Sequence, residues 1–93
     1  MKEPLTSSDA KHLLVKILES GRVEISGHAR TEMNNDNIND QDVYLVLRGG
    51  VVEPAGFERG SWRYRVRGTR LYVVVCFRSE THTVVVTAWR KKR

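Results

Sequence analysis

Arginine is the residue type in this 93-residue chain with the most obvious capacity for chemistry. Five arginines lie within the twelve residues 59–70, and a second basic run, residues 89–93, ends the chain. Arginine pairs bidentately with phosphate, and exposed bases stack on aromatic faces. Since Trp62, Tyr64 and Trp89 stand among these arginines, the pattern favours a nucleic-acid surface. The alternative is a solvated basic face that only confers solubility.

The charge is unevenly divided along the chain. Residues 1–50 contain six basic and eight acidic side chains, a net charge of −2. Residues 51–93 contain ten basic and three acidic side chains, a net charge of +7, so the whole chain has +5. This asymmetry indicates a polyanionic partner, most often a nucleic acid.

Residues 61–67 alternate as a β-strand does. Trp62, Tyr64 and Val66 face one side, and the arginines at positions 63, 65 and 67 face the other. Three arginines cannot be buried without partners, and residues 51–93 offer only three glutamates. We therefore expect helices to cover the other face, with Tyr64 in the core, and the arginine face to stay open. Charged residues that protect an edge strand from aggregation are a compatible interpretation.

Helical spacing dominates residues 1–49. A cap at residues 6–9 and the stripe Leu13, Leu14, Ile17 and Leu18 predict a first helix, which Gly21 ends with a left-handed residue. An extended link over residues 23–25 follows. We expect a short second helix at 27–35 capped by Ser26, a left-handed Asn37, and a third helix through residue 48 capped by Asn39 or Asp40.

Strand patterns fill the rest of the chain. We predict an edge strand at 51–57 weakened by Pro54, a strand at 61–67, a turn at Gly68–Thr69, a central strand at 70–78 and a last strand at 82–90. The sequence predicts one α+β domain over residues 1–93. Its parts are an N-terminal helix (1–21), a histidine-containing helical region (22–49) and an antiparallel sheet (50–93). Two to three helices should pack on one face of three to four strands.

Other function classes are disfavoured. The longest apolar run, residues 71–77, is far shorter than the roughly 20 residues of a membrane span, and residues 1–4 lack the apolar stretch of a signal peptide. A single cysteine, Cys76, cannot form an internal disulfide. The three histidines and Cys76 lack the spacing of metal ligands. We expect a cytoplasmic protein without a metal, a small-molecule cofactor or a membrane partner.

Several short motifs resemble one known family. They are residues 26–33 (SGHARTEM), Ile38, 64–68 (YRVRG), 71–75 (LYVVV) and 84–90 (VVVTAWR), within about 65 of the 93 residues. They resemble domain-of-unknown-function family 4258, which is similar in turn to the RelE-like toxins and the motility quorum-sensing regulator toxin, within the barnase-like and RelE-like ribonucleases. Glu32 departs from the family pattern, which often has arginine there.

The resemblance implies a RelE-like fold and a toxin that cleaves RNA without a metal. The ribose 2′-OH attacks the adjacent phosphorus and the 5′-oxygen leaves. Histidine can move the protons and arginine can stabilise the charge on phosphate. His28 is therefore the candidate for proton transfer, and Arg63 and Arg65 are the candidates for phosphate charge. His28 as an ordinary surface histidine remains the alternative.

The wider set expected to bind nucleic acid is Arg30, Arg59, Arg67, Arg70, Trp89, Arg90 and Lys91. Trp89 and Arg90 are neighbours on one strand, so only one of them can face the substrate. The resemblance also implies an acidic antitoxin as protein partner, covering the arginine face. Two alternatives remain: a nucleic-acid-binding module without catalysis, and an interaction domain for an acidic protein.

Overall fold

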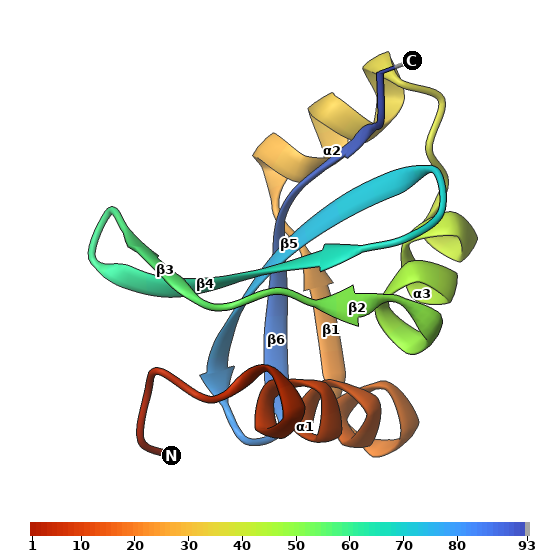
Figure 1. Cartoon of the computed structure of the whole chain (residues 1–93). Helices are drawn as coiled ribbons and strands as arrows, with labels where there is room; N and C mark the ends of the chain where they lie inside the picture. The colour runs from red at the N-terminus through yellow and green to blue at the C-terminus, as the bar shows by residue number, and fades with distance from the viewer. Residues whose placement is uncertain (93) are drawn as a thin grey trace.

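A computed structural model describes residues 1–92, which form three helices and six strands (Figure 1). The helices are α1 (Ser7–Ser20), α2 (Gly27–Asn35) and α3 (Asp40–Gly49). The strands are β1 (Arg22–Ile25), β2 (Val51–Val52), β3 (Gly56–Glu58), β4 (Ser61–Arg67), β5 (Leu71–Ser79) and β6 (His82–Arg90). Arg93, the last residue of the terminal basic run, lies outside the described residues.

Side-chain caps start all three helices. The Thr6 hydroxyl accepts from the backbone N–H of Asp9, and the Ser26 hydroxyl accepts from that of Ala29, both at 3.1 Å. Asn39 and Asp42 form a reciprocal capping box at α3. The predicted caps are confirmed, because short oxygen-bearing side chains satisfy the N–H groups that have no partner in the first turn.

Gly21 and Asn37 differ in backbone conformation. Asn37 has φ 56°, the predicted left-handed conformation. The same prediction for Gly21 is wrong, since its φ is −109°. A Cβ atom at Gly21 would lie 2.5 Å from the carbonyl oxygen of Thr81. Gly21 is therefore required because the β5–β6 turn approaches α1 closely.

The sheet has more strands than predicted and is mixed. Its order is β1-β6-β5-β4-β2, and β3 also pairs with β4. The link predicted over residues 23–25 is part of β1, which pairs in parallel with residues 82–85 of β6. A four-residue strand whose partner lies 60 residues away has little local signal. The strand predicted at 51–57 is divided into β2 and β3, because Pro54 and its neighbours interrupt the pairing with β4.

The predicted β4–β5 turn is one residue too early. Arg67 pairs with Tyr72, and the Gly68 N–H donates to the Leu71 carbonyl, so Thr69 and Arg70 form the tip of the hairpin. β5 lies between β4 and β6, which confirms that it is central.

All three helices contribute to one core on one face of the sheet (Figure 1). Their buried side chains meet the same-face side chains of β4, β5 and β6, among them Tyr64, Val73 and Val85. The Tyr64 hydroxyl donates to Glu3 (2.9 Å) and accepts from the Leu5 N–H (3.0 Å), and burial raises its pKa to about 12. Tyr64 is therefore a core residue, as predicted, and the opposite face of the sheet is left uncovered by helices.

No helix within residues 1–92 is long and apolar enough to span a membrane.

Candidate nucleic-acid interface

The uncovered face of the sheet, here called the open face, follows from strand register. Arg65 pairs with Val74, and Val74 with Thr87; Arg67 pairs with Tyr72, and Tyr72 with Trp89. Directly paired residues point to the same side of a sheet. Two rows of side chains therefore cross the open face, and each runs from an arginine on β4 to a residue of β6.

Tyr72 is the centre of an aromatic and cationic cluster on this face. Its ring lies 5.3 Å from the Trp89 ring, centroid to centroid. The Arg65 guanidinium carbon lies 4.9 Å from the Tyr72 centroid, and the Lys91 Nζ lies 5.1 Å from it. These are cation–π distances, which hold both cations against the ring. Tyr72 was missing from the predicted site, although the alternation of residues 71–78 placed it opposite the core.

A hollow of about 350 Å³ opens beside this cluster. Val74 and Thr87 line it from the two central strands, and Trp89 lines it from the end of β6. The other lining residues are Glu53, Pro54, Gly56, Glu58, Arg63 and Arg65. An aromatic side, an apolar part and two arginines are what a nucleotide requires, since its base stacks and its phosphate is anionic.

Glu53 partly neutralises the arginines of β4. One of its carboxylate oxygens accepts from Arg65 Nε, and the other lies 3.4 Å from Arg67 Nε. Arg63 is more buried, with 22% of its side chain exposed, and its nearest carboxylate oxygen, on Glu58, lies 4.0 Å away. Glu53 positions Arg65 and Arg67 but lowers the net positive charge along β4. Glu53 is one of the three glutamates counted in residues 51–93, and only the strand register shows that it pairs with Arg65 and Arg67.

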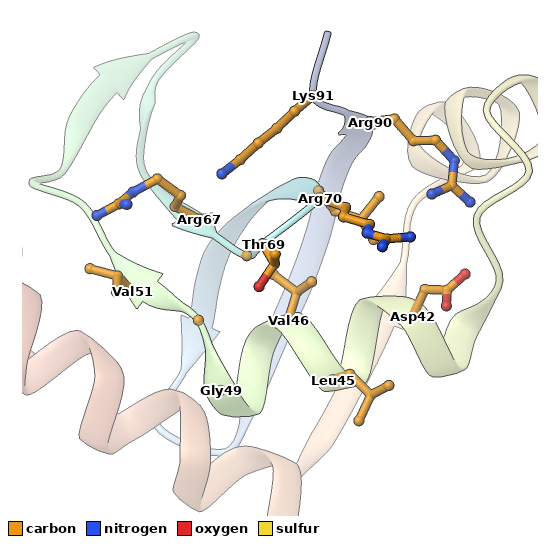
Figure 2. A pocket seen from close by; sticks show the side chains of 13 residues that line it. Asp42, Leu45, Val46, Gly49, Val51, Arg67, Thr69, Arg70, Arg90 and Lys91 are labelled. Atoms are coloured by element: carbon orange, nitrogen blue, oxygen red, sulfur yellow. The ribbon is translucent and has the colours of Figure 1, made fainter. Parts of the chain in front are cut away.

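Positively charged side chains that lack a carboxylate partner lie instead at the β4–β5 turn. Here α3, the turn and the end of β6 enclose a groove of about 820 Å³ (Figure 2). Arg70, Arg90 and Lys91 all line it. None of these three forms an ion pair with a carboxylate in the described residues.

The structure separates the roles of Trp89 and Arg90. Trp89 faces the open face, next to Tyr72. The Arg90 guanidinium donates to the carbonyl oxygens of Asp36 (2.7 Å) and Asn37 (2.8 Å) just after α2. Trp89 is thus available to a base, whereas Arg90 is anchored to the end of α2.

His28 and Arg30 lie on α2, which packs against β6 through Ala29 and Met33. Both are exposed, and Arg30 pairs with Asp40, which lowers the pKa of that carboxyl. Residues two apart on a helix project about 200° apart, so His28 points away from α3. His28 lines neither the hollow nor the groove.

The remaining candidates lie elsewhere. Arg59 is exposed in the β3–β4 turn, with φ 49°. Cys76 is half-buried, and burial raises the pKa of its thiol, so it is a poor nucleophile. His82 contacts Glu24 at 3.0 Å across β1 and β6. Residues 1–92 contain no group of three or more His, Cys, Asp or Glu side chains placed to hold a metal ion.

Comparison with known proteins identifies the family. Residues 25–90 match the domain of unknown function DUF4258. The chain belongs to this family, which confirms the resemblance seen in its motifs. No curated protein and no solved structure matches the chain significantly.

Proposed function

We propose that this protein binds single-stranded RNA on the open face of its sheet, with one base in the hollow beside Trp89. The hollow is the observation that supports the proposal. It combines an accessible indole ring with Arg63 and Arg65 at a size that admits one nucleotide. Paired bases are stacked within their helix and cannot enter such a hollow, so the proposed ligand is single-stranded.

Replacing Trp89 tests this proposal. Trp89→Ala removes the stacking surface, which contributes about 1–3 kcal/mol per base, so the affinity should fall roughly 5- to 150-fold. Trp89→Phe should retain most of the affinity because a ring remains. Fluorescence anisotropy with a labelled oligouridylate measures the binding, and circular dichroism checks the fold.

Phe57→Ala is the matched control. Phe57 is also aromatic and is 59% exposed, but it packs on Trp62 rather than in the hollow. Equal losses for Trp89→Ala and Phe57→Ala would contradict the proposal, as would no binding by the wild type at low salt.

A second proposed function is cleavage of the bound RNA, as in the RelE-like toxins that the family resembles. Attack of the 2′-OH on phosphorus breaks the P–O5′ bond and leaves a 2′,3′-cyclic phosphate and a 5′-hydroxyl. His28 would take or supply a proton, and Arg63 and Arg65 would stabilise the phosphate charge. His28 is exposed on α2, which packs along β6, but it lines neither the hollow nor the groove, so its role in this proposal rests on the resemblance of the motif that contains it. An acidic antitoxin covering the open face belongs to the same proposal.

Cleavage is tested by incubating the purified protein with RNA in EDTA and analysing product ends. Loss of a general acid or base costs about 10²–10⁴-fold in rate, which is the expected effect of His28→Ala. His12→Ala is the control, because His12 is also exposed but lies on α1. A folded wild type that yields no cyclic phosphate ends would refute cleavage and leave the binding proposal standing.

A further inference from the structure

The groove at the β4–β5 turn concentrates positive charge that the protein itself does not neutralise. Arg70 is exposed at the tip of the hairpin. The Arg90 guanidinium donates to two neutral carbonyl oxygens, while the nearby Asp36 carboxylate accepts from the Arg90 backbone N–H at 2.9 Å. The Lys91 Nζ lies 5.1 Å from the centroid of the Tyr72 ring. Against these three cations the groove has one carboxylate, Asp42, which already accepts from the Asn39 N–H at 3.0 Å.

Tyr72 connects the groove with the hollow on the open face through its two cationic contacts. Arg65, which lines the hollow, and Lys91, which lines the groove, both lie over its ring. In Figure 2, Arg70 and Arg90 extend toward the end of the groove where Asp42 lies, whereas Arg67 extends toward the opposite end. Cations are therefore distributed along the whole path from the hollow to the start of α3.

We propose that an RNA strand with one base in the hollow continues past Tyr72 into this groove, where Arg70, Arg90 and Lys91 bind its backbone phosphates. This inference rests on the proposed RNA binding and extends it from one nucleotide to a strand. Spaced cations suit a polyanion with regularly spaced charges. Arg90 is prepared for this role, because two carbonyl contacts fix its side chain before the ligand arrives.

Oligonucleotide length is the variable that tests the inference. Labelled oligouridylates of three and eight nucleotides are titrated at 0.1 M salt with the wild type, Arg70→Ala and Arg48→Ala. For single strands, log affinity changes by about 0.7 per phosphate contact per log unit of salt, so one contact contributes roughly fivefold at 0.1 M. Arg70→Ala should weaken the octanucleotide about fivefold and leave the trinucleotide unchanged.

Arg48→Ala is the matched control. Arg48 is an exposed arginine on α3 that does not line the groove, so its loss removes the same charge from a neighbouring position. An octanucleotide can also bind in several registers, and this raises its apparent affinity equally for all three proteins. The ratio of octanucleotide to trinucleotide affinity, compared between variants, removes that factor.

The outcomes distinguish this inference from the proposal on which it depends. The path through the groove is supported if the ratio of octanucleotide to trinucleotide affinity is lower for Arg70→Ala than for both the wild type and Arg48→Ala. A trinucleotide that binds while the ratio is the same in all three proteins overturns the path through the groove and leaves binding in the hollow intact. In that case, an acidic peptide whose binding requires Arg70 would assign the groove to a protein partner. Absence of binding at both lengths overturns both proposals.

Discussion

Tyr64 shows how one side chain ties the amino-terminal segment to the sheet. Its ring is fully buried, and its hydroxyl joins the Glu3 carboxylate to the Leu5 N–H. The ring therefore fills the core while the hydroxyl fixes residues 3–5 over it. Burial makes the charged phenolate costly and raises the pKa of Tyr64, the Glu3 carboxylate raises it further, and the Leu5 N–H opposes the rise.

This pKa predicts a loss of stability at alkaline pH. Because the pKa rises from 10.0 to about 12 on folding, the folded protein retains a proton that the unfolded chain releases between these values. The contribution of Tyr64 to the free energy of unfolding should therefore be fully present below pH 10. The free energy of unfolding should fall by up to about 2–3 kcal/mol as the pH rises through 12. Urea denaturation from pH 8 to 12 measures this change.

Tyr64→Phe provides the comparison for this effect. It lacks the titrating hydroxyl, so it should be less stable at pH 8 by about 1–2 kcal/mol and should show a shallower decline above pH 10. Parallel curves for the two proteins would assign the alkaline loss to other groups.

At the scale of elements, the junction of α3 and β2 sets the position of the groove. Gly50 lies where this junction touches β4: a Cβ atom there would be 2.6 Å from the Val46 carbonyl and 2.8 Å from the Arg67 carbonyl. Lys11 of α1 also donates to the carbonyl oxygens of Leu47 (3.1 Å), Arg48 (2.6 Å) and Gly50 (2.8 Å), which satisfies the end of α3.

The two adjacent glycines of this junction should respond differently to substitution. Gly50→Ala forces backbone apart in a packed region and should lower the free energy of unfolding by about 1–3 kcal/mol. Gly49→Ala meets nothing within 4 Å and adds a helix-favouring residue, so stability should be unchanged or slightly higher. Urea denaturation compares them, and equal effects would show that the close approach at Gly50 does not limit stability.

At the scale of the whole molecule, ion pairing redistributes the charge that the sequence places in its second half. Glu53 neutralises much of the positive charge on β4. Arg70, Arg90 and Lys91, near one end of the sheet, have no carboxylate ion-pair partner in the described residues. The sites of greatest positive charge are thus the β4–β5 turn and the end of β6, rather than the arginine-rich strand itself.

Salt dependence measures this distribution. The three phosphate contacts in the groove alone predict that log affinity for an octanucleotide falls with log salt with a slope of at least about −2. Glu53→Gln should release Arg65 and Arg67 for further contacts and make the slope steeper, toward about −3.5. A slope near zero for the wild type, or one that Glu53→Gln leaves unchanged, would contradict this assignment of charge.

Local sequence determined much of the architecture, since helix caps, strand alternation and turn residues act within a few positions of the chain. The bounds of α2, β4 and β6, the core position of Tyr64 and the arginine face of β4 all follow from such patterns. The motifs within residues 25–90 also identified the family.

Only the tertiary structure decided which side chains meet across strands. The parallel pairing of β1, the cluster of Tyr72, Trp89, Arg65 and Lys91, and the pairing of Glu53 with two arginines depend on contacts between distant segments. Periodicity assigns a residue to a face but not to a neighbour, because register is set by packing of the whole sheet. For that reason the arginines were evident in the sequence, whereas the hollow and the groove between them emerged only from the fold.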